Sequence, residues 1–162
     1  MSLKRYNLLA SAFVSCIIVT VAGCGGFSPD DAVGDQNDTN IKRLSNLYFR
    51  YQSGHNWSGP ESEDEFREYV KNDVPEFIKE RIGFTSVEEL FVSQRDGEPF
   101  KIRLEVKGSA RGCSEPAIFE STGVGGKRMV GFLNMFQREV DEQEYDDLWE
   151  GNFTPEDLIP TS

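Results

Sequence analysis

The apolar positions of the chain change their spacing near residue 97. Between residues 40 and 90 they recur at helical intervals, as in Ile41, Leu44 and Tyr48. From residue 100 onward the period changes to two, most clearly in residues 100–106, which is the spacing of strands. The sequence therefore predicts an α+β fold in which N-terminal helices are followed by a three- to four-stranded antiparallel sheet and a C-terminal helix.

Capping and turn residues predict where the helices begin and end. Asn40 is expected to cap the first helix, and Gly54 is expected to end it. Ser62 and Ser86 are each followed by Glu three residues later, which makes a capping box at a helix start. Another short helix is expected to begin at Pro75, because proline suits the first helical turn.

Four later segments have the character of strands. They are residues 100–106, 117–121, 127–133 and 136–140. In the first, the side chains of Phe100, Ile102, Leu104 and Val106 share one face, which predicts a strand packed on one side only. The Gly-rich segment 122–126 lies between two strands and not before a helix, so it is interpreted as a hairpin loop and not as a phosphate loop. Asp141 is expected to cap the last helix, in which Trp149 is expected to face the core.

The N-terminal region has a different character. Lys4 and Arg5 precede an uncharged apolar run at 8–20, and small residues follow just before Cys24. A basic start, a short apolar segment and a small-residue exit are typical of a secretory signal peptide. The run is shorter than the roughly 20 apolar residues that a membrane-spanning helix needs.

The segment Val21-Ala22-Gly23-Cys24 resembles a bacterial lipobox. This resemblance implies that residues 1–23 are a lipoprotein signal peptide and that Cys24 receives a diacylglyceride and a further acyl chain, such as palmitate. Two or more chains anchor a protein stably in a membrane, whereas one does so only marginally. Gly25 is not the Asp that retains lipoproteins in the inner membrane, so the outer membrane or the cell surface is the expected location.

Composition divides the remaining chain into a tether and one domain. Residues 24–40 are rich in Gly, Asp and Asn and hold no base, which predicts the lipidated cysteine followed by a disordered acidic tether. Residues 41–159 suffice for one globular domain. Loss of residues 1–23 moves the formal charge from -11 to -13, because Lys4 and Arg5 leave with them. So acidic a surface argues against binding to nucleic acid.

Few residues offer chemistry. Cys16 leaves with the signal and Cys24 carries the lipid, so Cys113 has no disulfide partner in the mature chain. It is interpreted as a half-buried, inert thiol, or alternatively as a reactive one. With one histidine and one usable thiol, no metal site and no cofactor are expected. The single His55 and the lack of nucleophile motifs indicate that the protein is not an enzyme, with an unrecognised hydrolase as the less favoured alternative.

One loop has the composition of a recognition surface. Tyr51, His55, Trp57 and Pro60 place aromatic and rigid residues close together in sequence. Aromatic residues are enriched where proteins bind partners, and aromatic rings also stack on sugars. The sequence leaves open whether Trp57 contacts a ligand or folds back onto the helices.

The segments RLSNLYFRYQSGHNWSGPESEDEFREYV, LFVSQRDGEPF, PAIFESTGVGGKRMVGF and EVDEQEYDDLW resemble those of small bacterial lipoproteins. The globular part of these proteins is similar to type II secretion pseudopilins, in which an N-terminal helix leads into a small antiparallel sheet. Pseudopilins keep an apolar N-terminal helix in the membrane, whereas signal cleavage would remove it here. The resemblance supplies no catalytic residues.

These observations predict a non-enzymatic envelope lipoprotein that is held to the membrane through Cys24 and presents a small acidic domain to another envelope protein. The alternative is a glycan- or cell-wall-binding module that uses Trp57 and Tyr51.

Overall fold

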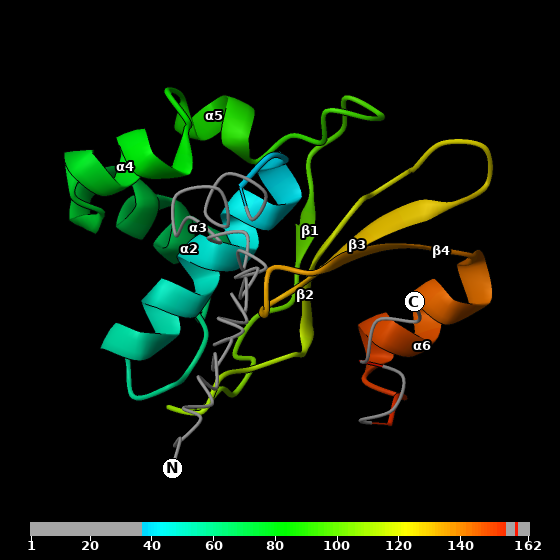
Figure 1. Cartoon of the computed structure of the whole chain (residues 1–162). Helices are drawn as coiled ribbons and strands as arrows, with labels where there is room; N and C mark the ends of the chain where they lie inside the picture. Colours follow the sequence, from blue (N-terminus) through cyan, green and yellow to red (C-terminus); the bar gives the residue numbers. More distant parts are fainter. Residues whose placement is uncertain (1–36, 155–157, 159–162) are drawn as a thin grey trace, which may run out of the picture.

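A computed structural model describes residues 37–154 and residue 158. It confirms the α+β fold, with helices on one side, a four-stranded antiparallel sheet and a C-terminal helix (Figure 1). The elements are α2 (Asn40–Gly54), α3 (Glu63–Glu68), a π-helix (Tyr69–Asp73), α4 (Glu76–Ile82), α5 (Val87–Leu90), β1 (Lys101–Ile102), β2 (Pro116–Phe119), β3 (Arg128–Phe132), β4 (Gln137–Val140) and α6 (Glu142–Glu150). The signal peptide, Cys24 and most of the expected tether lie outside the described residues. Within the described ranges, no helix has the length and apolar character needed to cross a bilayer.

Helix α2 begins differently from the sequence-based expectation. Thr39, and not Asn40, is the N-cap, and its hydroxyl accepts a hydrogen bond from the Lys42 N–H. Asn40 is the first helical residue, and its side-chain amide donates to the carbonyls of Glu89 and Val92. The end of the segment assigned to the tether is therefore folded: Asn37 and Asn40 are buried.

The serine half of each predicted capping box is present before the sheet. The Ser62 hydroxyl accepts from the Glu65 N–H, and the Ser86 hydroxyl accepts from the Glu89 N–H. Gly83 ends α4 in the left-handed conformation, with a φ of 83°, which glycine adopts without steric cost. The spacing of apolar residues does not predict the π-helix that follows α3.

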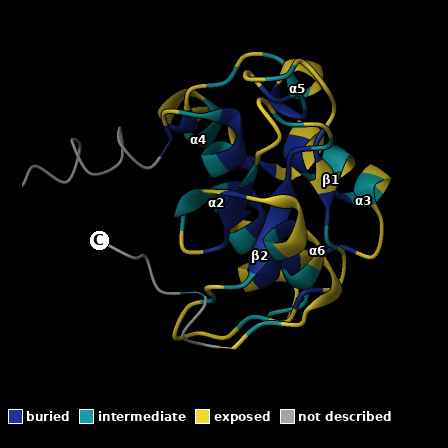
Figure 2. Cartoon of the chain, turned by 90° about the vertical axis from the view of Figure 1, so that its right-hand side faces the viewer, coloured by how far each residue is buried: buried dark blue, intermediate teal, exposed yellow. Residues whose placement is uncertain are grey.

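The sheet is a meander, and both of its faces are covered. Strand order is β1-β2-β3-β4, and each neighbouring pair is antiparallel. Helix α2 lies on one side of the sheet and α6 on the other (Figure 1). The buried residues gather along α2 and β2 in the middle of the domain (Figure 2). Two apolar clusters result, one on the α2 side and a smaller one on the α6 side.

Strand β1 is shorter than predicted. Of the expected strand 100–106, only Lys101–Ile102 is β-strand in the structure. Leu104 is 41% exposed, so it does not share the buried face of Phe100, Ile102 and Val106. Glu105 has a φ of 54°, which breaks the extended backbone. Alternation therefore located the strand but overestimated its length.

Two later expectations are confirmed and one is corrected. The hairpin between β2 and β3 turns at Val124 and Lys127, whose backbones exchange hydrogen bonds. The Asp141 carboxylate caps α6 by accepting from the Glu144 N–H. Trp149 was expected in the core, but it is 38% exposed and packs edge-on against Phe119, with ring centroids 5.1 Å apart.

Candidate functional site

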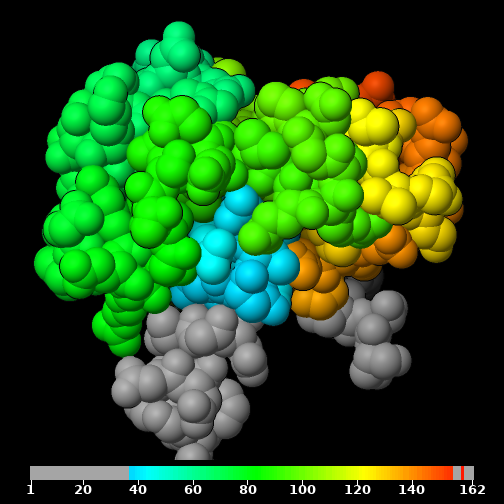
Figure 3. All heavy atoms as spheres, turned by 90° about the horizontal axis from the view of Figure 1, so that it is seen from above, coloured from blue at the N-terminus to red at the C-terminus, as the bar shows by residue number. Residues whose placement is uncertain are grey.

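A groove with a volume of about 610 Å³ opens beside the N-terminal half of α2. The chain of α4 and α5, in green, closes one side of the cyan helix start, and β4, in orange, lies on the other side (Figure 3). The groove is lined by Asn40, Arg43, Gly83, Phe84, Thr85, Ser86, Glu88, Glu89, Leu90, Val92, Ser93 and Gln94. Such a volume falls within the range of small-molecule sites.

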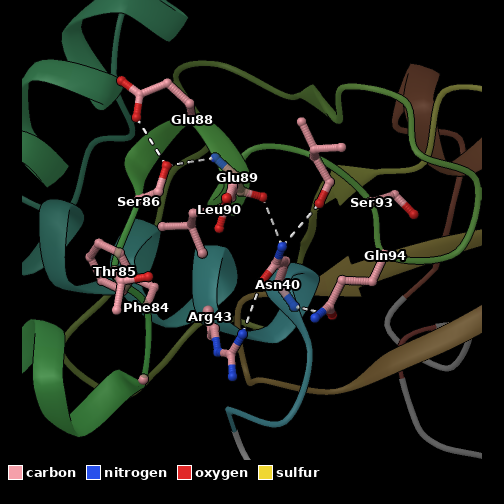
Figure 4. Close-up of a pocket in the computed structure, with 12 residues that line it drawn as sticks. Asn40, Arg43, Phe84, Thr85, Ser86, Glu88, Glu89, Leu90, Ser93 and Gln94 are labelled. Atoms are coloured by element: carbon pink, nitrogen blue, oxygen red, sulfur yellow. Dashed lines mark hydrogen bonds between the residues drawn. The ribbon is translucent and has the colours of Figure 1, made fainter.

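Arg43 lines this groove, and hydrogen bonds hold its guanidinium group in place (Figure 4). Its Nε donates to the Ile82 carbonyl at 3.2 Å, and its Nη1 donates to the Asn40 Oδ1 at 2.9 Å. Asn40 is fixed in turn by its bonds to the α5 segment, so the plane of the guanidinium is set by two elements. The Nη2 group faces Gly83, where a side chain would begin 3.6 Å away.

The partners of Arg43 are all neutral. Among the described residues, the other half-buried arginines each have a carboxylate within ion-pairing distance; they are Arg67, Arg103, Arg128 and Arg138. Arg43 forms no such pair in the described part of the chain. Taking a cation partly out of water costs free energy that a paired counter-charge offsets, and Arg43 lacks such a directly paired carboxylate.

The four residues of the expected recognition loop do not form one exposed surface. Tyr51 is only 3% exposed, and Pro60 is also buried. His55 is exposed and stacks flat on the Tyr51 ring, with centroids 3.9 Å apart. Trp57 is half-buried and packs near Phe49, with centroids 5.9 Å apart. The structure thus brings Tyr51 and His55 together but directs Trp57 to another neighbour.

The loop is also tied to the chain that follows β1. The Gly108 N–H donates to the Trp57 carbonyl, and the Gly59 N–H donates to the Val106 carbonyl. The Glu105 N–H donates to the Pro60 carbonyl, and the Lys107 ammonium binds the Ser58 hydroxyl at 2.6 Å. The loop is therefore a fixed part of the fold.

Tyr51 is used to hold the start of α3. Its hydroxyl donates to a Glu65 carboxylate oxygen, and the other oxygen accepts from the Glu61 N–H. Burial and the nearby Glu65 raise the pKa of Tyr51. The hydrogen bond from Tyr51, with that from Glu61, lowers the pKa of Glu65.

Acid should weaken this contact. Because the folded-state pKa of Glu65 lies below its ordinary value of 4.5, the contact contributes fully above that pH and is lost as the pH falls through the folded value. The contribution should be less than about 1 kcal/mol, since Glu65 is solvated. Urea unfolding in acid and at neutral pH should show a smaller pH dependence in both Glu65→Gln and Tyr51→Phe. An unchanged pH dependence in both variants would contradict the assignment.

One buried carboxylate was not singled out in the sequence. Glu120 is 1% exposed and follows β2 directly. One of its oxygens accepts from the Ser93 hydroxyl and the other from the Met129 N–H, both at 2.7 Å. Arg95 lies 3.7 Å from Glu120 and also pairs with the exposed Glu139 at 2.7 Å. Glu120 thereby joins the 93–95 loop to the sheet. Its position at the end of an apolar strand is only weak evidence in the sequence that its side chain is buried.

A second surface lies along α6, which carries the exposed Trp149. Two cations lie over the neighbouring Tyr145 ring: the Arg128 guanidinium at 4.1 Å and the Lys101 ammonium at 5.9 Å from its centroid. Arg103 lies 5.6 Å from the Phe153 ring, just beyond α6. We call Lys101, Arg103, Arg128 and Trp149 the α6 surface. It combines an exposed indole with three cations, of which Arg103 and Arg128 are paired with Glu115 and Glu142.

Cys113 is half-buried and packs against the larger apolar cluster. Burial raises the pKa of its thiol, which disfavours the nucleophilic thiolate. In the part of the chain that the structure describes, no three metal-ligating side chains come together.

Comparison of the chain with protein-family models, with curated protein sequences and with solved structures finds no match.

Proposed function

We propose that this protein is an exported, lipid-anchored envelope protein that is not an enzyme and whose acidic domain binds another envelope protein. The lipobox-like VAGC segment supports anchoring through Cys24 at the outer membrane or cell surface. The proposal places the contact on the α6 surface and not on the Tyr51–Pro60 loop, because two of the four loop residues are buried.

The observation that carries the proposal is the exposure of Trp149. It is 38% exposed although its ring packs edge-on against Phe119, with ring centroids 5.1 Å apart. Trp, Tyr and Arg dominate the binding energy of protein interfaces. A tryptophan held at a fixed angle on the core loses little conformational freedom when a partner covers it.

An in-cell crosslinking pull-down of the full-length protein tests this proposal. The native form should be recovered from membranes with a specific protein, and Cys24→Ser should lose both the membrane and the partner. Trp149→Ala should stay in the membrane and lose the partner by at least about tenfold, as expected of a hot-spot residue.

Phe77→Ala is the matched control, because Phe77 is a 66% exposed aromatic side chain on α4. It should keep both the membrane and the partner. Equal membrane partition of the native and Cys24→Ser forms would contradict lipid anchoring. Retention of the partner by Trp149→Ala would contradict the α6 surface, and turnover of a substrate by the purified protein would contradict the non-enzymatic assignment.

The glycan-binding alternative has less support. Stacking on a sugar requires an open ring face, and the faces and edges of Tyr51 are occupied by His55, Phe66 and Tyr69. Of the two residues that this alternative uses, only Trp57 remains partly exposed. Cosedimentation with isolated cell wall that disappears in Trp57→Ala would restore this alternative.

A further inference from the structure

We infer that the groove at Arg43 is a binding site for the free C-terminal carboxylate of a short peptide that ends in a small apolar residue. This ligand class goes beyond the proposed function and uses a different surface from that of Trp149.

The carboxylate would supply the counter-charge that Arg43 lacks. Two hydrogen bonds, to the Ile82 carbonyl and to Asn40 Oδ1, fix the guanidinium before any ligand arrives. Planar guanidinium groups bind carboxylates through two parallel hydrogen bonds, and a group already held in place loses little entropy on binding. Gly83 leaves the Nη2 side of Arg43 accessible because it has no side chain.

The rest of the lining selects among anions. The half-buried Phe84 and Val92 provide apolar surface for a small side chain beside the carboxylate. Glu88 and Glu89 also line the groove, and neither pairs with Arg43. These two acids would repel a doubly charged phosphate about twice as strongly as a single carboxylate. The charge of -11 on the whole chain acts in the same direction.

The inference can be tested by following backbone amide shifts of the full-length protein in detergent during titration with N-acetyl-alanyl-valine. The shifts should concentrate at Gly83, Thr85 and Gln94. The C-terminal amide of the same dipeptide and inorganic phosphate serve as comparison ligands. We expect the amide to bind at least about tenfold more weakly, since a hydrogen-bonded charge pair is lost.

Three substitutions distinguish the contribution of Arg43 to binding from a general effect of charge on binding. Arg43→Gln should weaken binding by about tenfold or more. Arg50→Gln is the matched control on the same helix, because Arg50 is exposed and its side chain donates to Asn46 Oδ1, away from the groove lining. Gln94→Glu keeps the oxygen that accepts from the Asn40 N–H and adds a negative charge at the rim, so it should also weaken binding in a folded protein.

Three results would overturn the inference. They are equal binding of the acid and the amide, tighter binding of phosphate than of the dipeptide, and undiminished binding by both Arg43→Gln and Gln94→Glu. Loss of binding in Arg43→Gln and Gln94→Glu together with an unchanged Arg50→Gln would support it. Because Trp149→Ala leaves this groove intact, failure here and failure of the pull-down are distinguishable.

Discussion

Replacing Glu120 with Ala should lower the free energy of unfolding by about 3 kcal/mol or more. The substitution removes the acceptor of the buried Ser93 hydroxyl and of the half-buried Met129 N–H. It also removes a carboxylate that lies 3.7 Å from Arg95. Leaving buried donors unpaired costs much more than the net gain of making a hydrogen bond.

Urea unfolding followed by tryptophan fluorescence would measure the loss for Glu120→Ala. Glu139→Ala is the control, because Glu139 pairs with the same Arg95 while its side chain is 45% exposed. An exposed pair contributes at most about 1 kcal/mol, so this control should stay close to the native protein. Equal losses in the two variants would mean that the buried network around Glu120 does not hold the 93–95 loop to the sheet.

Replacing Gly59 with Ala should cost about 3 kcal/mol through overpacking. A Cβ atom at Gly59 would lie 2.7 Å from Tyr48 Cζ and would also collide with the Tyr48 hydroxyl. Tyr48 is fully buried and cannot move aside, since its hydroxyl donates to the Arg103 carbonyl and accepts from the Val106 N–H. Displacement of the ring would break both bonds and expose the larger apolar cluster.

The same unfolding measurement applies to Gly59→Ala, with Gly54→Ala as its control. A Cβ atom at Gly54 meets nothing within 4 Å, and alanine favours the helix that ends there. Gly54→Ala should therefore be neutral or slightly stabilising. A Gly59→Ala variant as stable as Gly54→Ala would show that the 57–60 loop can move away from Tyr48, against the fixed geometry described above.

Local signals predicted much of the fold. The Ser62, Ser86 and Asp141 caps and the Gly-rich hairpin depend on neighbours in the sequence, so short motifs were enough to locate them. The inward side of α2 was predicted for the same reason, because Leu44 and Tyr48 repeat at helical spacing.

Features that depend on distant contacts were not predicted. The extended backbone is broken at Glu105, and residues 105–108 pair with the 57–60 loop. These two segments are far apart in the sequence, so the alternation of apolar residues cannot reveal their contact. Gly131 is required because a Cβ there would lie 2.7 Å from Ile41 Cγ1, where α2 crosses the sheet. The sequence predicts Asn40 as a helix cap, but in the structure its side chain joins α2 to the α5 segment.

In the candidate site as well, the features that depend on distant contacts were not predicted from the sequence. Composition drew attention to Tyr51 and Trp57, but one side chain is buried and the other half-buried. Nothing in the sequence distinguishes Arg43 from the arginines that have acidic partners, because those partners come from other elements as well as from the same helix. Trp149 shares helical spacing with Tyr145, although only Tyr145 is fully covered.

The pairing of the 57–60 loop with the chain beyond β1 also affects how copies of the protein behave beside one another. Strand β1 is an edge strand, and an open edge is a template onto which a second chain can add its own strand. Here only Lys101–Ile102 forms strand, and the backbone that continues it is already paired with the loop. If lipid anchoring concentrates many copies on one membrane, this arrangement protects them from edge-to-edge aggregation along β1.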